Sequence, residues 1–184
     1  MTHRRRRNPR HRSYKRMDNA LAYIDTVIAR TGLLTARQRL DHLAPFNSAM
    51  SLLRTGAGTA EAVANLVDGL NIAAELCKLR ICNDRRGDIA AGLQALIALS
   101  ARAQSTGTWC LLTSEIEPLE EAVFIHAVQV DHCSSGEFQS AIAAVIAMTR
   151  QALAGHAAPG VAVVDPLTQG ANASEAAALL AAST

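Results

Sequence analysis

Aromatic residues and long hydrophobic runs are scarce in this chain. Only 3% of its 184 residues are aromatic, and no run of about 18 apolar residues, the length that crosses a membrane, is present. The hydrophobic fraction of 49% is largely alanine, which favours helices, whereas a sheet core draws on aromatic and β-branched residues. We therefore expect an all-α protein that does not span a membrane.

Cysteines and catalytic motifs are also sparse. The four cysteines are too few and too irregularly spaced for a disulfide framework, so a cytoplasmic location is the simplest expectation, with an arginine-rich organellar transit peptide as the alternative. No GxSxG, Walker or GxGxxG pattern is present, and the glycine-containing loop Thr55–Thr59 lacks the lysine and preceding strand of a phosphate loop. The sequence thus predicts that the protein is not an enzyme and needs no cofactor.

Acidic residues are missing from the N-terminal segment, where positive charge collects instead. Eight of the 18 lysines and arginines precede the first acidic residue, Asp18, which leaves 10 basic residues against 16 acidic ones in the rest of the chain. The formal net charge of +2 therefore conceals an arm of about +8 joined to a body of about −6. Because like charges and Pro9 oppose collapse and helix formation, residues 1–17 are expected to be disordered.

The basic arm suits nucleic acid. Closely spaced arginines neutralise phosphates and release counterions, and a tyrosine can stack on a base. An acidic partner protein, an anionic membrane, and a simple solubility or targeting role are the alternatives. The predicted residues for binding DNA or RNA, without sequence preference, are Arg4, Arg5, Arg6, Arg7, Arg10, Arg12, Tyr14, Lys15 and Arg16.

The rest of the chain divides into a body and a tail. Apolar residues recur at helical spacing up to about residue 155, and glycine, proline, alanine and polar residues dominate beyond it. We predict a bundle of five or six helices over 18–155. A flexible, disordered tail is expected over 156–184, with a frayed helix at Ser174–Ala182.

Capping signals set the first helix boundaries. Asp18 or Asn19 can cap a first helix that stops at Gly32. Thr35, followed three residues later by Gln38, has the form of a capping box for a second helix.

Proline and glycine mark special positions in the later helices. Pro45 predicts a kink, or two short helices in place of one. Gly69 lies inside the third helix, where a glycine lets another helix approach closely. Either Ser114 with Glu117, or Pro118 as the first helical residue, marks the start of the fifth helix.

The last two helices are expected to form an antiparallel hairpin. Their predicted connection, 134–136, is very short, and short links join antiparallel neighbours. The predicted inward stripe of the fifth helix is Leu119, Ala122, Val123, His126, Ala127 and Val130.

A metal site is one alternative for the body. Cys77 and Cys82, together with His132 and Cys133, supply the atom types that zinc prefers. However, the first pair is spaced unlike a zinc knuckle, and neighbours on a helix point about 100 degrees apart. Buried free thiols and no metal are therefore the prediction.

Acid and base catalysis is a second alternative. His126 lies on an apolar stripe, with Glu120, Glu121 and His132 within a few turns. No spacing forces these groups into contact, and a satisfied core or interface histidine is the prediction.

A helix-turn-helix is a third alternative. Residues 35–54 and 59–80 are two predicted helices joined by a short turn, but the turn holds two glycines and the first helix contains Pro45. The second helix offers only Glu61 and Asn65 near its start for reading bases.

Three stretches support a family resemblance. They are Asp68-Gly-Leu-Asn-Ile-Ala, Thr106-Gly-Thr-Trp109, and the run from His126 to Phe138. Together with the arm they resemble small uncharacterised helical proteins of proteobacterial phages, prophages and mobile elements, some of which are labelled Fis-family transcriptional regulators. The resemblance spans residues 4–150 and implies no catalytic residues. Unlike the basic C-terminal helix-turn-helix of Fis, the last helix and tail here hold Arg150 as their one basic residue.

The sequence as a whole predicts a non-enzymatic, nucleic-acid-associated accessory or regulatory protein. Its arm would bind the phosphate backbone and its body would supply folding and protein contacts. The alternative is a helical protein-protein interaction module, such as a phage-encoded modulator of a host factor. A homodimer is a further expectation, because bundles with little aromatic surface often dimerise.

Overall fold

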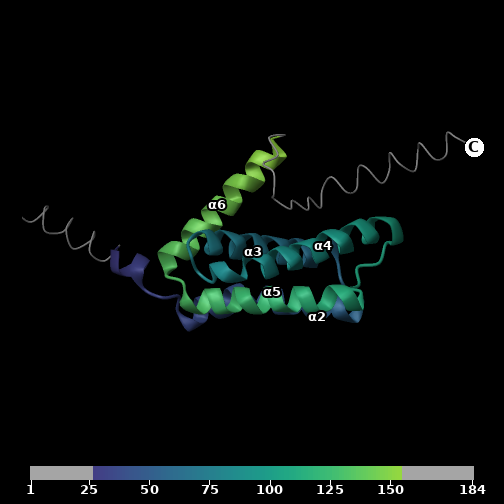
Figure 1. Cartoon of the computed structure of the whole chain (residues 1–184), viewed down its shortest axis with the longest axis horizontal. Coiled ribbons are helices and arrows are strands. Elements are labelled where there is room, and N and C mark those ends of the chain that lie inside the picture. Colours follow the sequence, from purple (N-terminus) through teal and green to yellow (C-terminus); the bar gives the residue numbers. More distant parts are fainter. Residues whose placement is uncertain (1–26, 155–184) are drawn as a thin grey trace, which may run out of the picture.

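The protein is an all-α bundle, as predicted (Figure 1). The computed structural model describes residues 27–154. The arm, the cap of the first helix at Asp18 or Asn19, and the tail with Ser174–Ala182 lie outside the described residues. The helices of the described residues are a helical segment at residues 27–31, α2 (Ala36–Thr55), α3 (Ala60–Lys78), the 3-10 turn η1 (Asn83–Arg85), α4 (Arg86–Thr106), α5 (Thr113–His132) and α6 (Ser135–Leu153).

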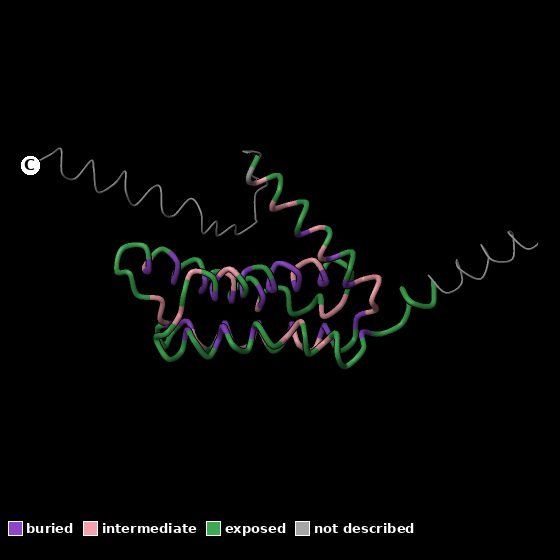
Figure 2. Tube along the Cα trace, turned by 180° about the vertical axis from the view of Figure 1, so that it is seen from behind, coloured by how far each residue is buried: buried purple, intermediate pink, exposed green. Residues whose placement is uncertain are grey.

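Helices α2 to α5 run alongside one another along the long axis of the molecule, and short connections reverse the chain between them (Figure 1). Helix α3 is central, because it packs against α2, α4, α5 and α6. Figure 2 shows the buried residues on the sides of the helices that face one another. Two apolar clusters fill the space, one among α2 to α5 and a smaller one around Ile72, Leu76, Val130 and Phe138 that includes α6.

The predicted caps are present where the described chain begins. The N–H of Gly32 donates to the carbonyl of Ile28 at 3.0 Å as the first helix ends. Thr35 and Gln38 form the predicted capping box, since the N–H of Gln38 donates to Thr35 Oγ1 at 3.2 Å and the N–H of Thr35 donates to Gln38 Oε1 at 2.9 Å. Gly56, at φ 77°, ends α2 in the left-handed conformation that glycine adopts without strain.

Gly69 has the role expected of it. A Cβ atom at this position would lie 1.6 Å from Cε1 of Phe46, so the ring from α2 occupies the space that any side chain would need. Phe46 is itself buried and touches the ring of His126 on α5 at a centroid distance of 5.4 Å. The close approach of α2 and α3 therefore depends on this glycine.

Pro45 does not divide the second helix, so the prediction of two short helices is wrong. A single helix, α2, continues from Ala36 to Thr55. Proline at this position removes the hydrogen bond to the carbonyl of Asp41. Pro45 is exposed, so water can satisfy that carbonyl and the helix continues.

The start of α5 also differs from both predictions. The helix begins at Thr113, and Pro118 lies in its second turn. Glu115 sets the start, because its carboxylate accepts the N–H of Leu112 at 2.8 Å and binds both terminal nitrogens of Arg102. Arg102 also donates to the carbonyl of Cys110 at 2.7 Å, which ties the end of α4 to the loop before α5. This long-range ion pair has no signal in local spacing.

The last two helices do not form the predicted hairpin. Helix α6 packs on α3 and leaves the bundle at an angle to α5 (Figure 1). Cys133 and Ser134 have extended backbones, with ψ of 149° and 156°, and the N–H of Ser135 donates to the carbonyl of Gly32 at 2.8 Å. The link therefore redirects the chain toward the segment after the first helix, where Phe138 and Val145 join the smaller cluster.

Replacing Gly69 with alanine is expected to destabilise the fold. Alanine gains about 1 kcal/mol of helix propensity over glycine, but overpacking a filled core costs about 1–3 kcal/mol, and Phe46 has little room to move. Urea unfolding should show a net loss of about 1–2 kcal/mol for Gly69→Ala. Gly87→Ala is the matched control, because a Cβ there meets nothing within 4 Å, and it should be neutral or stabilising. A stabilising Gly69→Ala would contradict the packing.

Candidate functional site

The predicted nucleic-acid-binding residues, Arg4 to Arg16, lie outside the described residues. The structure therefore informs this site only through the charged residues of the body. All ten of the remaining lysines and arginines lie within residues 27–154.

Most cations of the body are engaged by carboxylates. The ion pairs on or between α2 and α5 are Arg37 with Asp41, Arg39 with Asp131 at 3.2 Å, and Arg54 with Glu120. The others are Lys78 with Glu75, Arg85 with Asp88 and Glu121, and Arg102 with Glu115. Six of the ten body cations are thus close to an acidic side chain, which reduces their attraction for phosphate.

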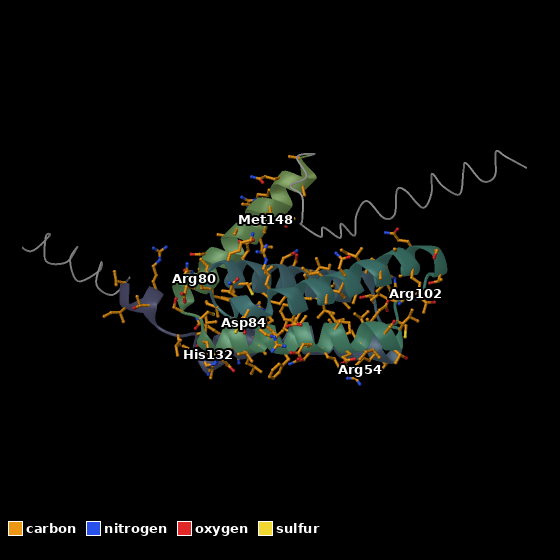
Figure 3. All side chains as sticks on the ribbon, in the orientation of Figure 1. Arg54, Arg80, Asp84, Arg102, His132 and Met148 are labelled. Atoms are coloured by element: carbon orange, nitrogen blue, oxygen red, sulfur yellow. The ribbon has the colours of Figure 1, made fainter. Side chains whose placement is uncertain are left out.

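Arg80 lies at the end of the bundle where the described chain begins. Figure 3 places its side chain at the same end of the long axis as residues 27–31, and Arg30 is in that first helical segment. Both side chains are exposed. Arg80 has a positive φ of 69° and its N–H donates to the carbonyl of Cys77 at 2.9 Å, so the turn after α3 fixes its position. No ion pair is formed by either arginine within residues 27–154, so both charges are open to an anionic partner.

A buried histidine pair lies between α2 and α5. Nε2 of His42 and Nε2 of His126 are 2.8 Å apart, so one nitrogen donates and the other accepts. His126 is only 1% exposed, and His42 is partly buried. Phe46 and Phe138 flank His42 at centroid distances of 5.0 and 4.7 Å. The pair is an internal link between two helices.

Gln129 continues this polar link into α3. Its Nε2 donates to the carbonyls of Ala73 at 3.1 Å and Ile81 at 2.9 Å, and contacts Sγ of Cys77 at 3.2 Å. These bonds orient the amide and leave its Oε1 without a partner one turn from Nδ1 of His126, which also has none. A proton on Nδ1 of His126 places a donor near that acceptor, and Nε2 of His126 then accepts from His42.

Burial sets the ionisation of these groups. Desolvation, followed by the proximity of His42, lowers the pKa of His126 to about 3, and desolvation also lowers the pKa of His42. Both imidazoles are neutral at pH 7. Hydrogen bonds from Arg102 lower the pKa of Glu115, which stays ionised at the loop between α4 and α5.

The acid and base candidates do not converge. Glu120 pairs with Arg54 and Glu121 with Arg85 at the surface, while His132 is exposed at the last residue of α5. His126 faces the interior. The predicted burial of this histidine is present, but only its Nε2 has a hydrogen-bond partner, so the prediction of a satisfied side chain holds in part. That partner, His42, is the residue that sequence reasoning missed. The signal was its spacing four residues before Phe46, on the face that continues through Met50 and Leu53.

The zinc candidates are also dispersed. Cys77 and Cys133 are buried free thiols in different clusters, and Cys82 is half-buried. Burial raises the pKa of Cys133 to about 11 and also raises the pKa of Cys77, so neither is a thiolate at neutral pH. Between residues 27 and 154, no group of three or more histidine, cysteine or acidic side chains is placed to hold a metal ion.

Helix α3 is poorly placed to act as a recognition helix. Eleven of its 19 residues are buried, and it packs against four other helices. Glu61 and Asn65 are exposed, but a helix enclosed in this way cannot enter the major groove. The helix-turn-helix alternative therefore lacks an exposed reading element.

Comparison with known proteins adds no relative. The chain matches no protein-family model, no curated protein and no solved structure. Over the described part of the chain, the helices are too short or too polar to cross a bilayer.

Stability should fall as the pH drops below 6.5. The pKa of His126 is about 3 in the folded protein and about 6.5 in the unfolded chain, so below 6.5 the unfolded state binds the proton first. The free energy of unfolding should decrease with a slope approaching about 1.4 kcal/mol per pH unit, and His42 adds to the loss. Urea unfolding between pH 7.5 and pH 5 measures this above the range where carboxylates titrate.

The matched variant is His126→Leu, which has no titrating group at this position. It should be less stable at pH 7.5 because His42 loses its partner, and its stability should depend less on pH. An unchanged slope in His126→Leu would mean that other groups cause the pH dependence.

Proposed function

We propose that this protein is a non-enzymatic, nucleic-acid-associated accessory or regulatory protein, in which residues 1–16 supply most of the affinity. The observation that carries the proposal is the separation of charge. Eight cations precede the first acidic residue, whereas six of the ten body cations lie in ion pairs. The cations of the arm have no acidic neighbours in the sequence, so they are the ones that phosphates engage most strongly.

The surface of the body supports an orientation for such a complex. Asp88, Glu117 and Glu121 gather where α4 meets α5, with Arg85 as a partner for two of them, and make that side the more acidic one. A negative surface repels the phosphate backbone, whereas Arg30 and Arg80 lie near the start of the described chain. The nucleic acid would therefore contact the arm and the end of the bundle next to it.

The proposal assigns no catalytic role to the body. The titratable candidates His126, Glu120, Glu121 and His132 do not share a cleft, and the most perturbed of them is inside the core. The described side chains therefore favour a role in binding a partner over a role in catalysis.

Salt dependence tests the proposal directly. If the arm neutralises about five phosphates, the logarithm of the affinity should fall with the logarithm of salt concentration at a slope of about −4. Deleting residues 1–16 should remove most of the binding and flatten the slope. Fluorescence anisotropy with a labelled duplex and a labelled single strand, at several salt concentrations, measures both values. Undiminished binding by the truncated chain would overturn the proposal.

A pair of single substitutions tests the proposed orientation. Arg80→Gln, at the end of the bundle where the described chain begins, should weaken binding slightly for every sequence and reduce the salt slope by about 1. Arg150→Gln, on the last turns of α6, removes the same charge and should leave the slope unchanged. Equal effects from the two variants would show that only net charge matters.

A helical interaction module is the second candidate. The exposed side chain of Phe124 on α5 favours it, because aromatic residues are enriched where proteins meet. A partner retained after deletion of residues 1–16, in the presence of nuclease, would support this function over the first. A phage or mobile-element origin stays a prediction.

A further inference from the structure

Helices α2 and α5 meet along an outer seam that carries the two most exposed large apolar side chains of the bundle helices. Phe124 of α5 is 63% exposed and Leu40 of α2 is 61% exposed. A groove of about 570 Å³ runs between the helices here. Its lining residues are Asn47, Met50, Ser51, Arg54, Thr55, Glu120, Val123, Phe124 and Ala127.

The residues of this seam share one side of each helix. On α2, Leu40, Asn47, Ser51 and Arg54 follow at intervals of seven, four and three residues, the spacing of one helical face. On α5, Glu120, Phe124, Ala127 and Asp131 follow at intervals of four, three and four. The seam is thus a continuous surface about four turns long on α2 and about three on α5, and Figure 3 shows Arg54 on the outer side of the layer formed by α2 and α5.

Charge on the seam is divided between the two helices. Both cations, Arg39 and Arg54, come from α2, and both anions, Asp131 and Glu120, come from α5. Arg39 pairs with Asp131 at one end and Arg54 pairs with Glu120 at the other, with the apolar groove between them. Each pair is formed within one chain, but in both the cation lies on the α2 side and the anion on the α5 side, so the seam carries a charge dipole across its width.

We propose that this seam is the interface between two copies of the chain, related by a two-fold axis parallel to α2 and α5. Such an axis lays α2 of one copy over α5 of the second without exchanging the ends of the seam. Each cationic edge then faces an anionic edge, Arg54 over Glu120 and Arg39 over Asp131, on both sides of the axis.

The same rotation accounts for the apolar groove. Phe124 of each copy lies over α2 of the other, where Asn47 and Ser51 leave space and Met50 forms the floor. An aromatic anchor in a pocket, surrounded by a polar rim, is the usual anatomy of an interface. A partner that carries charge of a single sign would complement only one edge of the seam. A second copy complements both edges, because it presents carboxylates to one and arginines to the other.

Light scattering on the full-length protein after nuclease treatment tests the proposal. At about 0.15 M ionic strength the mass should be twice 19.5 kDa. Phe124→Ala should weaken the dimer at least about 10-fold, and Phe124→Glu should give a monomer with an unchanged helical circular dichroism spectrum. Ile146→Glu is the matched control, because Ile146 is an exposed apolar residue on α6, away from the seam. A monomeric wild type, or a control that dissociates equally, would overturn the proposal.

Charge reversal separates this geometry from other modes of self-association. One variant, Arg39→Glu with Arg54→Glu, makes both edges of the seam negative, and the other, Glu120→Arg with Asp131→Arg, makes both positive. Each should be monomeric alone, and an equimolar mixture should restore the dimer because every edge again meets its opposite. Exposed ion pairs contribute little to folding, so both variants should stay folded. A mixture that stays monomeric would refute the proposed axis.

This inference is independent of the arm. Deleting residues 1–16 should leave the dimer intact, whereas the seam variants should leave arm-dependent binding measurable. The two proposals can therefore fail separately.

Discussion

The buried amide of Gln129 constrains how α5 aligns with α3. It reaches from α5 to the carbonyl of Ala73, inside α3, and to the carbonyl of Ile81, in the turn that follows. One turn earlier on α5, His126 reaches His42 on α2. A shift of α5 by one turn would break these hydrogen bonds. Each buried polar group that is left without a partner costs about 1–3 kcal/mol, so the shifted alignment is unfavourable. An aliphatic core alone would tolerate several alignments, and this link specifies one.

Close approaches between helices depend on the same alignment. Gly69 accommodates Phe46, and a Cβ atom on Gly92 of α4 would lie 2.4 Å from that of Ala122 on α5. These small residues let alanine-rich helices pack tightly with few aromatic side chains. The ion pair of Arg102 with Glu115 then holds the end of α4 to the start of α5.

The features that could be predicted from sequence are those encoded locally. The capping box of Thr35 and Gln38, the glycine stops and the close approach at Gly69 each follow from neighbouring residues, and all are present. The features that differed depend on partners distant in the sequence. Helix α5 begins where Glu115 meets Arg102, and α6 turns toward α3 because Ser135 bonds to Gly32. His42 was overlooked because its role exists only beside His126, 84 positions away.

The candidate site also has features that the sequence predicts and features that only the structure reveals. Net charge and its position along the chain are readable from sequence, and they identified the arm. Spacing alone did not reveal that six body cations are paired with acids, nor that α2 and α5 divide charge between the two edges of one seam. We therefore propose that the arm supplies affinity for nucleic acid and that the body supplies self-association.

That division is tested most directly by an NMR titration of the isotope-labelled full-length protein with a short duplex. The account predicts that amide shifts change in residues 1–17 and near Arg30 and Arg80, while the amides of α4, α5 and α6 keep their positions. Changes concentrated on the helices of the body, with the arm unaffected, would contradict it.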